Sequence, residues 1–377
     1  MGAIRRGVLS AGGAAAAARP GLLRAPAALV ICLLLAGCAE PDLSEWTLQL
    51  TEELTIGAEP VTAETAFYNP KALGFDFTGN VFVLDGDNHR VQVFDPRGGF
   101  LRSFGEAGVG PGQLQDPQGM FVHPDGRVWV ADTSNRRLQP YSPSGVPLDT
   151  ITLDAFPLDV VVGADRIFLQ RFPRTDMTYG PDPSPLIRVL DRSGNPTGGF
   201  ADPVPTPVGV MYLLENVTSL APAPGGGVAI ADSYFSSRIR VYEPGGALAR
   251  EIPVLYKAGA WAPLGRRPTE LNDESLQLLA RTSSDLAWDE RRGLFWLLAG
   301  NVDRNPDGEW IIGTELYRYD PNGVYHGSLM LPQRNIVVAV GPDGRVWTID
   351  IEGVVHAFRV SDPDMAPETS VAGGEPP

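Results

Sequence analysis

The chain has 377 residues, of which 43% are apolar and 20% charged, with a formal net charge of −15 and two cysteines. This length can bury a large core, the negative charge argues against nucleic acid as a partner, and two cysteines exclude a disulfide framework or a cysteine metal site. The 43 glycines and 35 prolines are spread along the chain, which favours an all-β architecture of many short strands.

Residues 1–37 are predicted to be a lipoprotein signal peptide. Four arginines precede an apolar run over residues 27–35, which is too short to span a bilayer as a mature helix. The run ends in Leu-Ala-Gly-Cys at positions 35–38, which resembles the bacterial lipoprotein signal. The resemblance implies that Cys38 is lipidated and becomes the first mature residue. The alternative is an ordinary or uncleaved signal that contains a chance cysteine.

Residues 38–45 are predicted to form a lipidated tether. Each buried methylene of an acyl chain contributes about 0.8 kcal/mol, so the chains on one cysteine can hold a protein at a membrane. Removal of residues 1–37, which carry four arginines and no acid, takes the net charge from −15 to −15 − 4 = −19. Ala39 follows the cysteine instead of the Asp of the inner-membrane retention signal. We therefore expect a protein of the cell envelope, anchored in the outer membrane of a Gram-negative-type bacterium.

A degenerate repeat occupies the rest of the chain. Residues 79–94 align with residues 126–141, and each segment reads as a turn, a short apolar strand, a loop that opens with Asp, and an alternating strand. Six copies of this meander predict a β-propeller, because a four-stranded blade must stack on its neighbours to bury both faces. The landmark positions of the six copies are Phe82, Trp129, Phe168, Ala229, Trp296 and Trp347. We expect the five aromatic ones to fill the core between blades rather than form a stacking platform.

The last copy lacks a fourth strand. Its three strands are expected near residues 336–340, 346–351 and 354–360, and the opening segment offers a strand at 46–50 or 54–56. A first strand that completes the last blade closes the ring and removes two open edges. The prediction is a six-bladed propeller with four-stranded antiparallel blades over residues 46–360, followed by a disordered tail over 361–377.

The first two copies resemble NHL repeats, and the whole chain resembles the six-bladed propeller lipoproteins that are built from them. The match is specific in copies one and two, weaker in four and six, and poor in three and five. The resemblance implies a propeller that recognises protein, nucleic acid or sugar, with a minority of enzymes among its relatives.

Four long segments identify a candidate binding face. In a propeller the loop between the second and third strands and the crossover to the next blade lie on one face, and residues 171–185, 201–216, 252–282 and 299–314 all belong to that face. Residues 268–281 could form a short helix over the opening, or a plain packing cap. The candidate binding residues on this face are Asp85, Asn88, His89, Asp132, Asn135, Arg136, Arg171, Asp232 and Arg238.

Four aspartates recur where the second strand of a copy ends: Asp85, Asp132, Asp232 and Asp350. They could bind a cation or a basic ligand. The structural interpretation is stronger, since an Asp that opens a tight loop accepts backbone N–H groups within it, and an Asn three residues later tolerates a left-handed conformation. His89 would need further histidines to hold zinc, and the equivalent residue of the second copy is Arg136. We therefore predict no metal site.

The predicted function is a non-catalytic, monomeric binding module for a protein, peptide or glycan, without a cofactor and without nucleic acid as a partner. The alternative is a divalent-cation-dependent hydrolase or lyase of the gluconolactonase or streptogramin-lyase type. It would hold Ca²⁺ or Mg²⁺ in the central channel through Asp85, Asp132 and Asp232. No Gly-rich phosphate loop, Gly-x-Ser-x-Gly elbow or His-Glu-x-x-His helix occurs in the sequence. The sequence therefore disfavours enzymatic activity without deciding the question.

Overall fold

The computed structural model divides into two units, Met1–Pro41 and Asp42–Pro377. The residues that the structure describes all belong to the second unit: 48–58, 61–62, 65–173, 175–176, 180–206, 209–234, 236–255, 283–299, 301–304, 310–312 and 314–361. The predicted signal peptide, Cys38, the tether, the segment 268–281 and the tail from residue 362 lie outside this part. No helix within the described ranges is long and apolar enough to cross a membrane.

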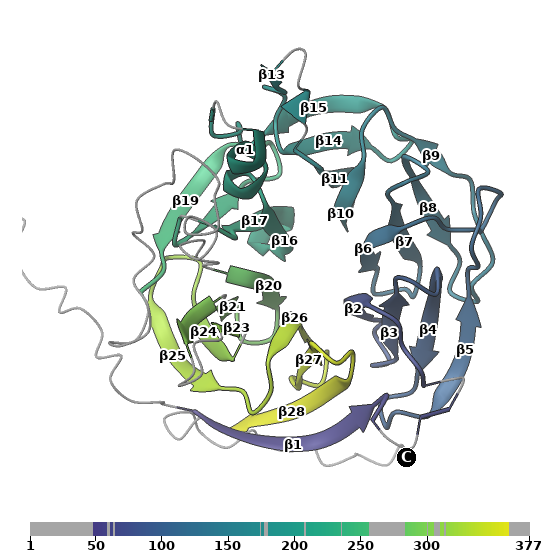
Figure 1. Ribbon diagram of the computed structural model, residues 1–377, viewed down its shortest axis with the longest axis vertical. Helices are drawn as coiled ribbons and strands as arrows, with labels where there is room; N and C mark the ends of the chain where they lie inside the picture. Colours follow the sequence, from purple (N-terminus) through teal and green to yellow (C-terminus); the bar gives the residue numbers. More distant parts are fainter. Residues whose placement is uncertain are drawn as a thin grey trace, which may run out of the picture. The chain divides into compact units, whose positions relative to one another are not determined.

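Six four-stranded antiparallel sheets form the second unit, and we number them as blades in chain order. Their first strands contact one another in cyclic order around the centre of the ring (Figure 1). This confirms the predicted six-bladed propeller. Blades 1 to 3 consist of β2 (Pro70–Phe75), β3 (Val81–Asp85), β4 (Arg90–Phe94) and β5 (Phe100–Phe104); β6 (Pro117–Val122), β7 (Val128–Asp132), β8 (Arg137–Tyr141) and β9 (Ile151–Thr152); and β10 (Pro157–Val162), β11 (Arg166–Arg171), β14 (Ile187–Asp191) and β15 (Pro196–Phe200).

The other three blades follow the same order, and the last of them takes its outer strand from the start of the chain. They consist of β16 (Thr218–Ala223), β17 (Gly227–Asp232), β18 (Arg238–Tyr242) and β19 (Leu248–Pro253); β20 (Ser283–Asp289), β21 (Leu294–Ala299), β24 (Glu315–Tyr319) and β25 (Tyr325–Met330); and β26 (Asn335–Val340), β27 (Val346–Asp350), β28 (Val355–Ser361) and β1 (Gln49–Ile56).

The second strand of each blade is buried on both faces, because each blade packs between two neighbours. Strands β3, β7, β17, β21 and β27 are buried at every residue. The six landmark residues all lie in second strands and are all buried, which confirms that they belong to the core. In the described chain the apolar side chains form six clusters, each shared by two adjacent blades. For example, Phe82 of blade 1 packs with Met120 of blade 2.

Strand β1 closes the ring by pairing with β28 in antiparallel register, from Gln49 opposite Ser361 to Ile56 opposite Val355 (Figure 1). Two side-chain contacts reinforce the pairing. Glu53 forms an ion pair with Arg359, and a Glu52 carboxylate oxygen lies 2.6 Å from His356 Nδ1. The prediction that an N-terminal strand completes the last blade is confirmed. The strand covers all of the second expected position, the gap before it and the last two residues of the first.

Because the strands alternate in direction, the turns after first and third strands lie at one end of the propeller, the turn face. The turns after second strands and the crossovers between blades lie at the other end, the loop face. Short additional elements belong to the loop face: the hairpins β12 (Thr175–Asp176) with β13 (Gly180–Pro181) and β22 (Asn301–Arg304) with β23 (Trp310–Ile312), and helix α1 (Gly209–Glu215). A single 3₁₀ turn, η1 (Pro224–Gly226), joins β16 to β17 on the turn face.

These additions divide the propeller into two sectors. The regular sector comprises blades 1, 2 and 6, in which the second and third strands are joined by short turns. The irregular sector comprises blades 3, 4 and 5. It contains both extra hairpins, helix α1 and the crossover that includes residues 256–282, which lie outside the described part of the chain. The predicted clustering of long segments at one face therefore also places them in one half of the ring.

Candidate functional site at the loop face

In blade 1 the second strand ends at the loop face with Asp85, which is fully buried. Its Oδ1 accepts the backbone N–H of Tyr68 at 2.7 Å, and its Oδ2 accepts Asn88 Nδ2 at 2.8 Å and Arg90 Nε at 2.9 Å. The carboxylate therefore joins the turn between β3 and β4 to the segment that leads into β2. We call this arrangement the clamp.

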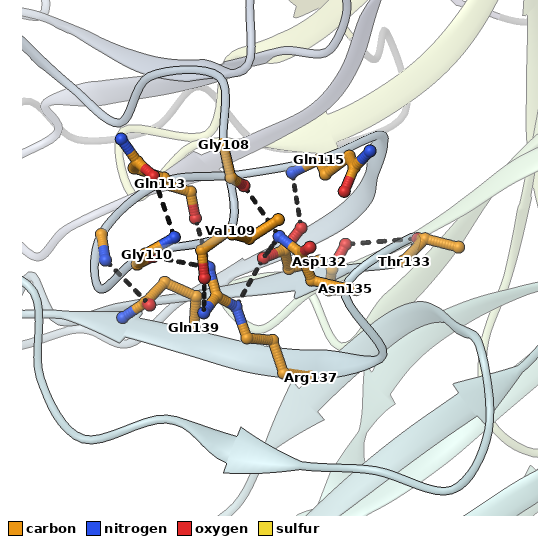
Figure 2. Close-up of polar contacts among 12 residues, drawn as sticks. Gly108, Val109, Gly110, Gln113, Gln115, Asp132, Thr133, Asn135, Arg137 and Gln139 are labelled. Atoms are coloured by element: carbon orange, nitrogen blue, oxygen red, sulfur yellow. Dashed lines mark hydrogen bonds and ion pairs between the residues drawn. The ribbon is translucent and has the colours of Figure 1, made fainter.

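Blade 2 repeats the clamp around Asp132 (Figure 2). Its carboxylate accepts the Gln115 N–H at 2.7 Å, Asn135 Nδ2 at 2.8 Å and Arg137 Nε at 2.7 Å. Arg137 also donates to the carbonyl oxygens of three residues of the preceding crossover: Val109, Gly110 and Gln113. The buried ion pair between Asp132 and Arg137 thus fixes both the turn and the crossover. Charge-assisted hydrogen bonds replace the water that both side chains give up on burial.

The clamps confirm a structural use of these aspartates but correct two details of the prediction. The backbone donors to Asp85 and Asp132 come from the preceding crossover, not from the turn itself. The left-handed residues of the two turns are His89 (φ 54°) and Arg136 (φ 50°), whereas Asn88 and Asn135 donate side-chain hydrogen bonds to the aspartates.

Blades 4 and 6 contain variants of the clamp. Asp232 accepts Arg238 Nε at 2.6 Å and a second guanidinium from Arg240. In blade 6, Asp350 accepts His356 Nε2 at 2.9 Å and two N–H groups of its own turn. Both ring nitrogens of His356 face a carboxylate. Burial alone would lower the pKa of His356, but the hydrogen bonds with Asp350 and Glu52 outweigh it and raise that pKa above its usual value.

Blades 3 and 5 lack the clamp aspartate. Arg171 occupies its position in blade 3, opposite Pro157 of the first strand, and Ala299 occupies it in blade 5, opposite Ser283. Arg171 is buried and turns towards its own long loop, where it pairs with Asp182 at 2.6 Å and donates to the carbonyl oxygens of Pro185 and Ser184. The two blades without a clamp aspartate are therefore the two that contain an extra hairpin.

Helix α1 is tied to the long loop of blade 3. The hydroxyl group of Tyr212, which is buried, donates to the carbonyl oxygen of Asp182. At the end of the helix, Asn216 accepts the Val204 N–H at 2.7 Å and donates to the Tyr212 carbonyl oxygen at 2.8 Å. These contacts give the crossover from blade 3 to blade 4 a defined shape, which makes it suitable as a binding surface.

The predicted site residues differ in their accessibility. Asp85, Asp132, Arg171 and Asp232 are buried in ion pairs, Arg238 is partly exposed but paired with Asp232, and Asn88, His89 and Asn135 are partly buried. Arg136 is exposed and lies 5.5 Å from the centre of the Phe156 ring. Within the described chain, no group of three or more His, Cys, Asp or Glu side chains gathers as metal ligands do.

A central channel of about 910 Å³ runs between the first strands of the six blades. Most of its lining is apolar or backbone. Charged residues lie near both ends: Lys71, Asp159 and Asp285 towards the loop face, and Asp76, Asp289, Glu290 and Arg291 towards the turn face. Asp85, Asp132 and Asp232 are not among the described residues that line it. The alternative cation site therefore lacks the carboxylates that the sequence assigned to it.

Asp159 and Asp285 are the carboxylates near the loop-face end of the channel, and the sequence analysis singled out neither. Asp159 Oδ1 accepts the N–H of Val160 at 2.8 Å, and Asp285 accepts the N–H groups of Leu286 and Val338. Burial is the main reason why the pKa of Asp159 is raised to about 8, and the negative charge of Asp285 adds to the rise. The available signal was a single acid inside the apolar run over residues 157–162, where a strand would otherwise contain no charge.

Comparisons with known proteins agree with the fold. No family model matches the chain. NHL repeat-containing protein 3 of mouse is 40% identical over 76 residues, which is 19% of this chain and 22% of that protein, so the match spans about a fifth of the relative. A putative exported protein of Bacteroides fragilis aligns over 84% of this chain and 96% of its own at 13% identity, with a TM-score of 0.55.

A member of the DUF4221 family from Bacteroides vulgatus aligns over 84% of this chain and 99% of its own at 12% identity, also with a TM-score of 0.55. At these identities the solved structures establish the fold alone. Together with the NHL match, they confirm the predicted resemblance to an NHL-repeat propeller.

Proposed function

We propose that the protein is a lipid-anchored β-propeller of the cell envelope that binds a protein, peptide or glycan partner through the irregular sector of its loop face. The observation that carries the proposal is a coincidence of three features in blades 3 to 5. These blades contain the added hairpins and helix α1, two of them lack the clamp, and they supply the acidic side of the channel.

The regular sector supplies a rigid frame for such a site. Its clamps hold the short turns and crossovers in place, and long loops on a rigid scaffold are where binding residues are disproportionately found. Phe172, at the start of the blade 3 loop, is 39% exposed and gives the surface an apolar contact group beside the buried Arg171. The net charge of −15 favours a basic partner.

Lipidation at Cys38 and residence in the outer membrane are part of the proposal, and so are a monomeric state and binding without a cofactor. The alternative of a divalent-cation-dependent hydrolase or lyase has no specific observation in its favour. Its assigned carboxylates, Asp85, Asp132 and Asp232, are already paired with arginines.

Photo-crosslinking in cells tests the binding face. A benzophenone amino acid is placed at Phe172 on the loop face, and at Val146 and Val324, which are exposed on the turn face. We expect adducts from position 172 and none from the two turn-face positions. Adducts that form equally from both faces would contradict the proposal.

The anchor is tested by acyl labelling. Metabolic incorporation of an alkyne fatty acid is expected in the wild-type protein and absent from the Cys38→Ser variant, which should leave the membrane fraction. If Cys38→Ser stayed in the membrane fraction after a high-salt wash, lipidation would not be the anchor.

A further inference from the structure

We infer that the tether holds the propeller with its turn face towards the lipid surface in which the acyl chains are buried, and with its loop face directed away from the membrane. The inference rests on the lipid anchor at Cys38 in the proposed function, and it adds the surface that meets the bilayer. The direction of β1, the length of the tether and the polarity of the rim carry it.

Strand β1 begins at the turn face. It pairs in antiparallel register with β28, with Gln49 opposite Ser361 at the turn-face end and Ile56 opposite Val355 at the loop-face end. The strand forms the outer edge of blade 6, on the rim of the ring (Figure 1). The chain that leads from the anchor therefore enters the propeller at the turn-face end of the rim.

Packing fixes the point at which the chain enters. Leu48, directly before β1, is 7% exposed and belongs to the apolar cluster shared by blades 5 and 6, together with Val346 and Phe358. Farther along the strand, Glu53 is paired with Arg359. Lifting this segment away would expose an apolar side chain and break the closure of the ring, so the tether pulls on a defined site.

The length of the tether disfavours contact between the loop face and the membrane. Ten steps separate Cys38 from Leu48 (48 − 38 = 10), and a fully extended chain of this length spans at most about 33–36 Å. Strand β1 has eight residues, and at about 3.2–3.4 Å per residue its ends are about 23 Å apart. A propeller that rested on its loop face would draw the tether back along the whole strand, which leaves about a third of its reach. A chain held near full extension has few conformations, and this loss of entropy is absent when the turn face is next to the membrane.

The rim of blade 6 is poorly suited to lie on the bilayer. The exposed residues of β1 include Gln49, Thr51 and Thr55, and none of these is apolar or basic. Apolar and basic side chains are the ones that gain from the boundary between headgroups and acyl chains. An edge-on orientation on β1 would therefore bring polar side chains to the lipid without a compensating contact.

The tips of the turns provide side chains of the suitable kind. Phe77, Val146 and Val324 are 74%, 57% and 53% exposed and lie in turns of blades 1, 2 and 5. Arg97 is exposed in a second turn of blade 1. The loop face also exposes apolar residues, such as Val109, so the tether and not apolar exposure distinguishes the two faces.

Several acidic side chains of the turn face are paired with arginines. Asp125 lies 2.7 Å from Arg127, and Asp343 lies 2.5 Å from Arg345. These pairs reduce the repulsion that a protein with a net charge of −15 would otherwise meet at an anionic lipid surface. The turn face can therefore approach phospholipid headgroups.

The test measures how close each face lies to lipid headgroups. After removal of residues 1–37, the one remaining cysteine is Cys38, which acylation blocks, so an introduced cysteine is the only free thiol. Val324→Cys and Met330→Cys are matched, because the native residues are 53% and 51% exposed at the turn-face and loop-face ends of the same strand, β25. Each purified lipoprotein is labelled with bimane and reconstituted in phosphatidylethanolamine–phosphatidylglycerol vesicles that contain lipids with nitroxide-labelled headgroups.

We expect the nitroxide lipids to quench bimane several-fold more strongly at position 324 than at position 330. Val146→Cys and Val109→Cys, at the two faces of blade 2, should repeat the difference and provide a second pair if a blade 5 variant misfolds by circular dichroism. Inserting a flexible Gly/Ser segment of about thirty residues after Ser44 should abolish the difference, because the tether then reaches past either face.

Equal quenching at both ends of β25, or stronger quenching at position 330, would overturn the inference. A difference that persisted with the lengthened tether would show that the tether is not its cause. If acyl labelling of Cys38 were negative, the anchor and the orientation would both fail. If Cys38 were acylated and the two ends were quenched equally, the anchor would stand and the orientation would fail alone.

Discussion

The carboxylates of the regular and irregular sectors differ in how many hydrogen-bond donors surround them. In blade 2, Asp132 is surrounded by donors from the turn, the crossover and Arg137, so its charge is fully satisfied. In blade 3, Asp159 has the N–H of Val160 as its hydrogen-bond partner in the described chain, and burial raises its pKa. A satisfied buried charge indicates a structural role, whereas an unsatisfied one that costs stability indicates a residue kept for function.

The largest expected effect is the loss of a clamp. Asp132→Asn leaves Arg137 without its counter-ion in a buried position, which should lower the free energy of unfolding by about 3–5 kcal/mol. Urea denaturation measures the change, with Asp165→Asn as the exposed control, for which about 0.5 kcal/mol or less is expected. A loss of less than about 1 kcal/mol in Asp132→Asn would mean that the clamp does not hold the regular sector.

Asp159→Asn should have the opposite sign. In the folded protein the pKa of Asp159 is about 8, above the ordinary value of 3.8, so the folded state binds the proton more tightly than the unfolded state. The destabilisation that this causes begins as the pH rises above 3.8 and is complete above 8. Replacement by Asn should therefore increase stability by roughly 1–3 kcal/mol at pH 8 and by little at pH 4. Urea midpoints across this range test it, and a destabilised variant at pH 8 would contradict the comparison.

A smaller effect is expected at the ring closure. Because the pKa of His356 is raised in the folded state, its contribution is fully present below pH 6.5 and is lost as the pH rises through the folded-state value. In an Asp159→Asn background, in which the channel carboxyl no longer titrates, stability should fall by about 0.5–1 kcal/mol between pH 6 and 9, a figure reduced because Glu52 is partly exposed to solvent. Adding His356→Gln should flatten this dependence of stability on pH. If the dependence persisted in the double variant, a group other than His356 would be responsible.

The smallest expected effect concerns Ser219. Ser219→Ala removes a buried hydroxyl group that has no partner in the described structure, so stability should increase by about 0.5–1 kcal/mol. Thermal unfolding of the variant and of Ser144→Ala, an exposed serine on the turn face, provides the measurement and its control. A decrease in Ser219→Ala beyond that of the control would show that the hydroxyl has a structural partner.

The repeated parts of the molecule could be predicted from the sequence because a repeat imposes the same physics at each copy. The landmark position is buried between blades, so an aromatic residue occupies it even in the poorly matching third and fifth copies. Strand β1 was predictable because the last copy lacked its outer strand, and an open sheet edge requires a partner.

The details of the site were less accessible, because they depend on contacts between segments far apart in the chain. The donor to Asp85 is the N–H of Tyr68, seventeen residues earlier, so a local rule for loops that open with Asp assigned the bonds to the wrong segment. Asp159 and Asp285 belong to different blades and share a level in the channel only through the register of their strands. The repeat comparison emphasised residues that recur, and these two occur where the repeat is poorest.

The most direct test compares two positions on the same face. Phe172 belongs to the irregular sector and Val109 to the crossover that the blade 2 clamp holds, and both are exposed. With a photo-crosslinker at each position in cells, we predict that position 172 yields partner adducts at least several-fold more often than position 109. Equal yields at both positions, or adducts from position 109 alone, would contradict it.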